Sequence, residues 1–547
     1  MSEQRFDNHA TSRRSFLVAS GGAVVTSAFL SAASTLSAQD KGAAKPAPPT
    51  PAPKAAKWRR LSLEGTGSGS PANMLASYKK AITAMLKLPP TDPRNWYRNA
   101  FIHTLDCPHG NWWFLPWHRG YIGWFEQTCR KLSGDPKFAF PFWDWTMEPK
   151  VPKSFWDGVL DPSNKLYISS FSAFQSTFTT PLANFWSGLS AAQLTQLSAR
   201  GITSVGDLWT SDWFPSMFFT PADARSLTAA DPDFDLVTKK AVSLNTLKAA
   251  ISAKVFVDAT TPANGFGSFK ATQHSEGTGS DVLESQPHNN VHNDVGGFMG
   301  DFLSPVDPIF FMHHSNIDRL WDVWTRKQQK LHAPTLPTGS DLAPWQKEPF
   351  LFYVDSDGKP VSKNTAGDYA TIGQFNYDYA PGSGDQFIPK TAVAAAAAAP
   401  VVAAQSLKAA VSANDLAMGQ GAQAQVSVPE SALRTADGGP QLSAQVSVEL
   451  PRNARGARLH VLVNPPAGAL SIPSSSPHHA GTIRVFGSPH HGPSTFVVPL
   501  TEAVRALRER GTLNPSEPLR IVVVPDRAGA ALTAFQGKVT DVTVSVH

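Results

Sequence analysis

Cysteine is scarce in this sequence, with only Cys107 and Cys129 among 547 residues. Two thiols cannot build a disulfide framework, so the fold has to be held by its hydrophobic core. Hydrophobic residues make up 41% of the chain, which is enough for a large core at this length. A single bridge between the two cysteines stays open, as does a separate use for each thiol.

Long apolar runs and blocks of one charge are also missing. Beyond the N-terminal region, no segment reaches the roughly 18 consecutive apolar residues of a membrane-spanning helix. The net charge of +5 is spread over the chain without a Lys/Arg block or an RNA-binding motif. We therefore predict no membrane span and no nucleic-acid partner.

Aromatic residues, in contrast, are abundant. The chain has 15 tryptophans and 32 phenylalanines, which crowd into residues 96–156 and 302–324. Most of them must be core, but they also suit the lining of a pocket for an aromatic substrate.

The N-terminus reads as an export signal. Residues 12–17, SRRSFL, form a twin-arginine pattern, and a mild apolar run and a small-residue site near Ala38 follow it. We predict a signal peptide over residues 1–38, a Pro/Ala linker over 39–57, and a periplasmic or secreted protein. The alternative is a disordered N-terminus with a chance arginine pair.

The segment 307–324, DPIFFMHHSNIDRLWDVW, predicts a helix that begins at its Asp-Pro pair. At helical spacing His314 and Asp318 share one face with three large apolar side chains, whereas His313 lies about 100° away. This pattern indicates a metal-binding imidazole at His314 that is oriented by the Asp318 carboxylate. A core helix with one polar spot is the alternative.

A second group of histidines lies near the start of the folded region. We expect helices over about 71–88 and 94–103, and a third helix opened by Pro116. His109 and His118 are nine residues apart and so face opposite sides of one continuous helix. His103 at a helix end, His109 in a loop and His118 in the first turn of the next helix can nevertheless meet at one point.

A third group is the pair His288 and His292, whose four-residue spacing turns both rings to one side of a helix. The spacing resembles the zincin motif, but no glutamate follows the first histidine. Together with His314 the pair makes a second set of three. Two all-histidine sets without a bridging carboxylate favour two copper ions, because di-iron bundles use glutamates. His274 is expected to be a solvated surface residue.

At this point a family resemblance is plain. HGNWWFLPWHRGYIGWFE, residues 109–126, and DPIFFMHHSNID, residues 307–318, look like the two copper signatures of the tyrosinase and polyphenol oxidase family of type 3 copper proteins. The resemblance implies two copper ions and dioxygen as co-substrate, with His313 as a neighbour of the ligands. The implied ligands are His103, His109 and His118 for the first copper, and His288, His292 and His314 for the second.

Two features near the first copper signature need separate mention: the short spacing between His103 and His109, and the position of Cys107. Only five residues separate His103 from His109, so His103 is assigned partly by elimination. Cys107 lies two residues before His109, as in relatives whose cysteine is bonded to that histidine by a thioether. A free buried thiol is the alternative, and a bridge to Cys129 is a further one.

The resemblance also divides the chain. Residues 58–390 would form a mainly α catalytic domain, an antiparallel helix bundle that ends in Tyr377-Asp-Tyr379, with Arg59 or Arg60 as the partner of the tyrosines. After an Ala-rich linker over 391–405, period-two patterns predict seven strands and one helix, TEAVRALRER, within 406–547. This β-sandwich resembles the C-terminal domain of latent polyphenol oxidases, which covers the copper site and inserts a blocking side chain. An accessory or oligomerisation module is the alternative.

The function implied is o-hydroxylation of monophenols and oxidation of o-diphenols to o-quinones. A phenol, with a pKa near 10, must lose its proton before it can bind copper. Glu284 and Asn289 occupy the positions where the family is proposed to hold an activating water, and helix capping by Glu284 is the alternative. Phe302 is a candidate gate above the second copper.

Several alternative functions stay open at this stage. They are a catechol oxidase without monophenolase activity, a reversible oxygen carrier with the same two coppers, and a zinc hydrolase built on HNNVH, residues 288–292. Small phenols are the expected partners, and the oligomeric state, including a homo-oligomer, stays open.

Overall fold

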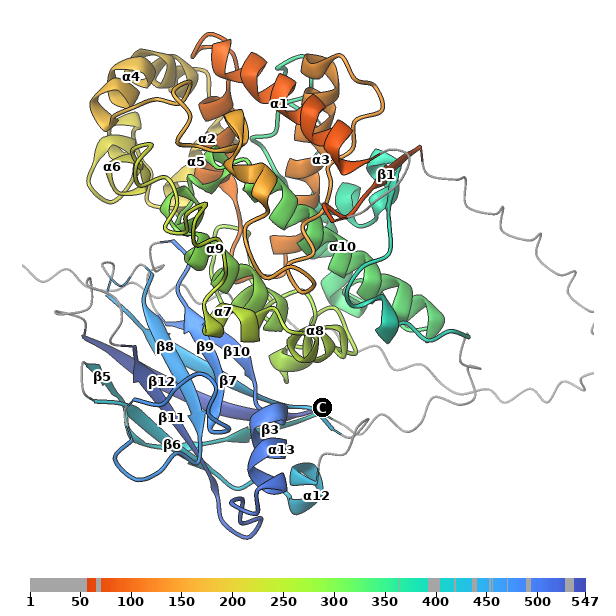
Figure 1. Ribbon diagram of the computed structural model, residues 1–547, viewed down its shortest axis with the longest axis vertical. Helices are drawn as coiled ribbons and strands as arrows, with labels where there is room; N and C mark the ends of the chain where they lie inside the picture. Colours follow the sequence, from red (N-terminus) through yellow and green to blue (C-terminus); the bar gives the residue numbers. More distant parts are fainter. Residues whose placement is uncertain are drawn as a thin grey trace, which may run out of the picture. The chain divides into compact units, whose positions relative to one another are not determined.

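The computed structural model describes residues 57–64, 70–362, 364–391, 404–417, 420–434, 440–451, 454, 456–469, 471–487, 493–526 and 536–547 (Figure 1). The expected signal peptide, the Pro/Ala linker up to residue 56 and most of the Ala-rich linker lie outside these residues. Among the helices that are described, none combines the length and the apolar character needed to cross a bilayer.

The N-terminal part of the fold is helical, as predicted. α3 packs against both α1 and α10, and α2 also contacts α1. The longer helices of this part are α1 (Pro71–Lys87), α2 (Trp96–Asp106), α3 (Phe114–Ser133), α4 (Phe171–Ser187) and α10 (Ile309–Lys330). The shorter ones are α5 (Ala191–Ala199), α6 (Phe214–Met217), α7 (Leu236–Ala241), α8 (Leu244–Ile251), α9 (Asn289–Val295) and α11 (Leu342–Lys347).

Several helix ends differ from the sequence prediction. α3 begins two residues before Pro116, so His118 lies in its second turn rather than in its first. Pro116 is tolerated there because the N–H groups of the first helical turn have no intrahelical acceptor. α10 is assigned from Ile309, but the Asp307 carboxylate still accepts the Ile309 N–H at 3.1 Å, as a capping residue does. The 17-residue α4 shows that residues 150–279 are more helical than expected.

A short parallel pair of strands joins the two ends of the helical part. β1 (Trp58–Arg60) pairs with β2 (Tyr377–Tyr379). Arg60 is the buried partner of the two tyrosines: its guanidinium stacks 3.7 Å from the centre of the Tyr377 ring and donates to the Tyr379 hydroxyl at 2.7 Å. Arg59 instead pairs with Asp378 at the surface.

The C-terminal part consists of two packed sheets, which confirms the predicted sandwich. One sheet has the order β10-β7-β12-β3, with β5 also paired to β12, and the other has the order β4-β6-β11-β8-β9. The strands are β3 (Gln405–Lys408), β4 (Ala410–Ala413), β5 (Asp415–Ala417), β6 (Ala422–Val426), β7 (Leu442–Glu449), β8 (Arg458–Val463), β9 (His479–Arg484), β10 (Ser494–Pro499), β11 (Leu519–Pro525) and β12 (Gln536–Val546). The helices are α12 (Glu430–Leu433) and the predicted α13 (Thr501–Glu509).

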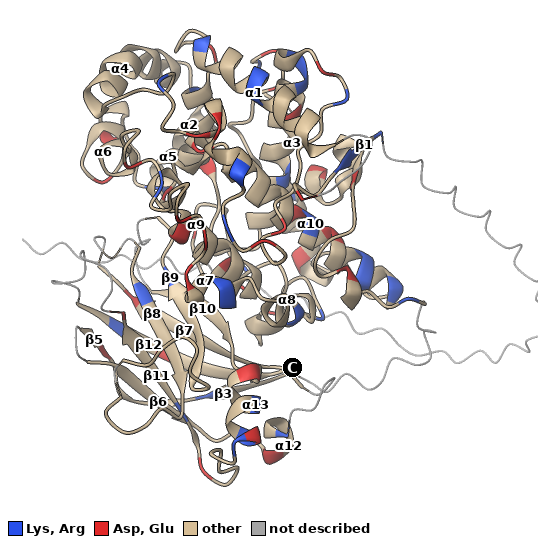
Figure 2. Ribbon diagram, in the orientation of Figure 1, with Lys and Arg blue, Asp and Glu red and all other residues tan. Residues whose placement is uncertain are grey.

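The seven predicted strands are all present, and β3, β4 and β5 were not predicted. These three are only three or four residues long and largely exposed, so they lack the buried alternation that marks a strand in sequence. Lys, Arg, Asp and Glu are interspersed over the described elements of both parts (Figure 2).

The sandwich and the helical part meet through backbone as well as side chains. Each has its own hydrophobic core, but Phe486 and Val497 of the sandwich belong to the core of the helical part. Strand β10 also binds a loop of the helical part, since the Ser280 N–H donates to the Thr495 carbonyl at 2.9 Å and the Val497 N–H donates to the Ser280 carbonyl at 3.2 Å. These contacts place the C-terminal part directly beside the segment that carries His288.

Candidate metal centre

The structure brings together the six histidines that the sequence singled out. They come from six different positions of the chain: α2, the loop after it, α3, a π-helical turn (Glu284–His288), α9 and α10. All six are buried, with at most 8% of the residue exposed. In that order they are His103, His109, His118, His288, His292 and His314.

The hydrogen bonds of the rings fix their tautomers. In four of them Nδ1 lies at 2.6–2.8 Å from an oxygen, so this nitrogen carries the proton and Nε2 keeps its lone pair. The acceptors are the Phe302 carbonyl for His103, the Phe114 carbonyl for His118, the Asn289 side-chain oxygen for His288 and the Met299 carbonyl for His292. Backbone and amide oxygens behind the rings therefore aim the lone pairs inward.

The inward nitrogens of each set converge to distances at which they can share one metal ion. His118 Nε2 lies 3.4 Å from His103 Nε2, and His292 Nε2 lies 3.2 Å from His314 Nε2. The Nε2 atoms of His109 and His288 have no hydrogen-bond partner. Burial lowers the pKa of all six rings, to about 3 for His103 and His288, so they are neutral near pH 7. Six neutral imidazoles with converging lone pairs fit copper, which prefers such ligands.

The two sets of three face each other. The rings of His118 and His314 stack with centroids 4.3 Å apart and an angle of 8°, and His109 lies 5.4 Å from His288. Phe114 and Phe310 pack against rings of both sets, which keeps the space between them apolar. This geometry can hold two metal ions side by side.

His313 lies close enough to the second set to be an alternative metal ligand to His314. One nitrogen of each of His288, His292, His313 and His314 lies within 4.8 Å of the others. The tautomer of His313 argues against its being a metal ligand. The Trp145 indole N–H donates to His313 Nδ1 at 3.2 Å, so the proton of the neutral ring sits on Nε2. A protonated Nε2 has no lone pair to offer a metal, so His314 is the better candidate ligand on this helix.

The expected pairing of Asp318 with His314 is wrong. His314 Nδ1 has no hydrogen-bond partner, whereas Asp318 accepts from Arg119 at 2.6 Å and from the hydroxyls of Tyr377 and Tyr379. Although burial opposes it, the guanidinium groups of Arg119 and Arg60 lower the pKa of Asp318. Two buried cations thus draw the carboxylate away from the imidazole, and Asp318 ties α10 to α3 and the β1–β2 pair.

The expected surface role of His274 is also wrong. This residue is 1% exposed and bridges two carboxylates, with Nε2 at 3.0 Å from Asp106 and Nδ1 at 2.6 Å from Glu348. Although burial alone would lower it, the pKa of His274 is raised by these two acids. Because Asp106 ends α2, the protonated ring fixes the loop between His103 and His109.

Cys107 and Cys129 are both unpaired and buried. Cys107 Sγ lies 3.4 Å from His109 Nδ1, so the thiol is beside the ring it was expected to touch. Burial raises the pKa of the Cys107 thiol.

Glu284 and Asn289 line a small cavity of about 50 Å³ together with His109 and Phe486. Glu284 accepts the Gly110 N–H at 2.7 Å and the Ser268 hydroxyl at 2.6 Å. Burial raises its pKa to about 8. Asp281, and not Glu284, accepts the backbone N–H at the start of this turn, so the capping alternative for Glu284 is not observed.

Phe302 lies at the first set of histidines rather than above the second. Its ring is 5.6 Å from His109 and 6.4 Å from His103, and its carbonyl holds the His103 ring. The reason is the short loop before α10, which bonds to the end of α2 through Thr104.

Phe486, from the C-terminal part, occupies the mouth of the histidine cluster. Its ring centroid lies 4.5 Å from His292, 4.8 Å from His109 and 5.5 Å from both His288 and Phe302. Two residues earlier, at the end of β9, the buried Arg484 pairs with Asp235 and, at 3.4 Å, with Asp294 near the end of α9. Nothing in the sequence distinguishes Phe486 from the other phenylalanines, of which the chain has 32 in all.

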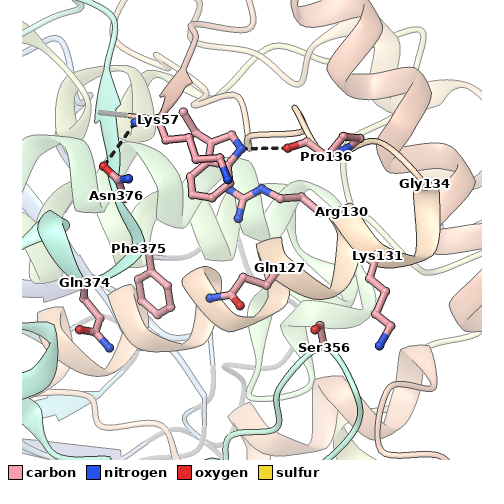
Figure 3. Close-up of a pocket in the computed structure, with 11 residues that line it drawn as sticks. Lys57, Gln127, Arg130, Lys131, Gly134, Pro136, Ser356, Gln374, Phe375 and Asn376 are labelled. Carbon is pink, nitrogen blue, oxygen red and sulfur yellow. Dashed lines mark hydrogen bonds between the residues drawn. The ribbon is translucent and has the colours of Figure 1, made fainter. Parts of the chain in front are cut away.

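A cavity of about 610 Å³ lies elsewhere and is lined by none of the six histidines. It surrounds the start of β1, where the Trp58 indole donates to the Pro136 carbonyl at 3.0 Å and the Arg130 guanidinium stacks on the Trp58 ring (Figure 3). These contacts fix β1 against the end of α3, and we assign no catalytic or metal-binding role to this cavity.

Comparisons with known proteins agree with this geometry. The family model for the common central domain of tyrosinase matches residues 90–327. The latent polyphenol oxidase of Prunus armeniaca is 27% identical over 331 residues, covering 56% of this chain and 46% of the relative. A tyrosinase of Hahella sp. is 26% identical over 342 residues, covering 56% of this chain and 60% of the relative. The chain thus spans about half the length of the curated relatives it matches.

Solved structures resemble the whole fold. A latent aurone synthase, a polyphenol oxidase, has a TM-score of 0.55 at 20% identity, covering 91% of this chain and 90% of that one. Latent apple tyrosinase has a TM-score of 0.53 at 20% identity, covering 91% and 98%. At this identity the likeness shows a shared fold, in which a helical part is followed by a β-rich part.

Proposed function

Because this chain belongs to the tyrosinase and polyphenol oxidase family of type 3 copper proteins, we propose that it oxidises phenols with dioxygen. A monophenol and one dioxygen would give an o-quinone and one water, and two o-diphenols and one dioxygen would give two o-quinones and two waters. The observation that carries the proposal is the pair of facing imidazole sets with inward lone pairs. Copper content together with phenol turnover tests it.

Each set of three imidazoles would hold one copper ion. The first would be bound by His103, His109 and His118, and the second by His288, His292 and His314. Bound copper would supply the binding of dioxygen between two metals and the acceptance of electrons from the phenol. The apolar rings around the sets would keep water out and hold an aromatic substrate, and Phe302 would form one wall of the entrance.

Glu284 and Asn289 would handle the proton of the incoming phenol. They would hold a water at the small cavity beside His109, and the carboxylate would make that water basic. Burial favours this role, because a pKa raised to about 8 makes the carboxylate a stronger base than an ordinary glutamate. Asn289 also orients His288 through its 2.8 Å hydrogen bond.

Glu284→Gln should lower the kcat of monophenol oxidation by on the order of 10²-fold, with a smaller loss on the matching o-diphenol. The base works only when ionised, so the rate of the parent enzyme should rise with pH and level off at or above about pH 8. Initial rates against pH, measured with Phe486→Ala as the common background, check this.

The matched control is Glu276→Gln, which removes a partly exposed glutamate of the preceding loop. It should keep both the rate and the pH dependence. A Glu284→Gln enzyme with an unchanged pH profile would show that another group takes the proton.

The C-terminal part would make the enzyme latent. Phe486 takes the place where a phenol ring would sit, and the Arg484 ion pairs and the β10–Ser280 backbone bonds hold it there. A side chain that blocks the cluster and can be displaced suits an enzyme that is activated. The position of Phe486 therefore favours an enzyme over a reversible oxygen carrier.

A catechol oxidase is the second candidate from the same chemistry. The ratio of initial rates on a phenol and on its catechol separates the two, and the presence of both Glu284 and Asn289 favours monophenol hydroxylation. A zinc hydrolase on residues 288–292 would instead contain zinc and would not develop a peroxide-dependent absorption when loaded with copper.

Two further steps would complete maturation. Oxidation by dioxygen at copper would join Cys107 Sγ to a carbon of His109 with loss of two hydrogen atoms to water, which the intact mass of the copper-loaded chain registers. The chain would leave the cytoplasm folded by the twin-arginine route, so lysine at both Arg13 and Arg14 should leave it inside the cell.

A further inference from the structure

A separate cavity of about 120 Å³ lies against α2, on the face of the helix that is turned away from the metal centre. Four of its wall residues recur at the three- and four-residue spacing of one helix face: Arg98, Phe101, Ile102 and Leu105. His103 lies roughly 150° around the helix from this face, and none of the six histidines lines the cavity. Further walls come from α4, α5 and residues 351–360, and Pro360 among them is exposed, so solvent reaches the cavity there.

The guanidinium of Arg98 is buried at this cavity without a counter-charge. Only 8% of the residue is exposed, and its enclosed Nε has no hydrogen-bond partner. Among the described residues no carboxylate lies within 4 Å of the guanidinium nitrogens. Burial is the only cause that shifts the pKa of Arg98, which falls to about 10, so the group is charged at pH 7 and no neighbouring acid offsets its burial.

Arg98 differs in this respect from the other buried arginines of the described residues. Each of those pairs with a carboxylate: Arg60, Arg119, Arg130, Arg225, Arg319 and Arg484. Arg98 instead stacks on the Phe185 ring of α4, 4.5 Å from its centre. An aromatic face attracts a cation but does not fill the directed N–H donors of a guanidinium. A buried charge of this kind is costly unless an anion compensates it.

The other polar side chains of the cavity already have partners within the protein. The Gln193 amide nitrogen donates to the Leu351 carbonyl at 2.9 Å, and its oxygen accepts the Ser190 N–H at 3.0 Å. The Tyr353 hydroxyl donates to the Trp117 carbonyl. Most of the remaining walls are aliphatic, aromatic or proline side chains. The cavity therefore combines one unpaired cation with an apolar lining.

We propose that this cavity binds a small carboxylic acid with an apolar body, whose carboxylate pairs with Arg98 and whose hydrocarbon part lies against Phe101 and Leu105. A guanidinium can bind a carboxylate through two parallel hydrogen bonds, which supplies the missing counter-charge and acceptors together. An inorganic anion would pair with Arg98 but leave the apolar walls uncovered. The site shares no lining residue with the metal centre, so it does not depend on the proposed function.

Isothermal titration of the copper-loaded full chain with sodium butyrate tests the site, with sodium chloride at equal ionic strength as the blank. Arg98→Met should weaken butyrate binding at least about tenfold, because it removes charge-assisted hydrogen bonds. Arg59→Met is the matched control and should bind as the parent does, since Arg59 is exposed and pairs with Asp378. Any butyrate bound at copper would remain in both variants. Equal affinity in the two variants, or no butyrate heat above the chloride blank, would overturn the site.

Two relatives of butyrate test the proposal on the unaltered chain, where no variant can misfold. Butyramide has nearly the same shape without the charge and should bind at least about tenfold more weakly. Acetate keeps the charge but lacks two methylene groups, so it should bind at least about fivefold more weakly. Butyramide as tight as butyrate would overturn the role of Arg98, and acetate as tight as butyrate would overturn the assignment to an apolar acid.

Discussion

Replacing His314 with glutamine should remove one of the two copper ions and abolish phenol oxidation, whereas the same change at His313 should keep both ions. The two residues are adjacent and both fully buried, so the pair is matched in position and packing. They differ in which nitrogen is free, because the Trp145 indole fixes the proton of His313 on Nε2. Copper per chain and initial rates in the Phe486→Ala background give the comparison.

The His313 variant should lose no more than about ten- to hundredfold in activity, the range for residues that support a metal ligand from behind. Circular dichroism of both variants shows whether each is folded. Two coppers bound by the His314 variant, or one bound by the His313 variant, would mean that the wrong neighbour has been assigned.

Phe486→Ala should convert a latent chain into an active one without removing any part of it. Burial of a phenylalanine side chain contributes roughly 1.5–3 kcal/mol. Its loss should therefore shift the equilibrium between the blocked and the open cluster towards the open one by roughly ten- to a hundredfold. It should also empty the space that a phenol needs. The initial rate on a small phenol, compared with that of the unaltered chain at equal copper content, measures the effect.

A graded series strengthens this test. Phe486→Leu keeps an apolar plug of smaller size and should give a rate between the two. The ion pairs of Arg484 remain in both variants, so a difference between them reports the side chain in the cluster rather than detachment of the sandwich. An alanine variant no more active than the parent would show that the ring does not block the site.

The sequence predicted those parts of the site that follow from local periodicity. Helical spacing separated His314 from His313, and the break before Pro116 allowed His109 and His118 to converge. Helical spacing wrongly predicted that Asp318 pairs with His314. The structure gives the reason, because the carboxylate pairs with nearby buried cations instead of its helical neighbour. Arg60 and Arg119 reach it from elsewhere in the chain.

Long-range partners were beyond local patterns. His274 meets an aspartate 168 residues away, which no spacing rule could reveal. Phe486 reaches His292 from the other side of a linker, and its role depends on how β9 docks on α9. The family resemblance supplied the expectation of a plug but not the residue.

Copper analysis combined with peroxide addition tests the central claim most directly. The copper-loaded Phe486→Ala chain should contain two copper ions per molecule and develop a strong near-ultraviolet absorption when hydrogen peroxide is added. A single ion per chain, or two ions with no such absorption, would contradict a paired site built from these six imidazoles.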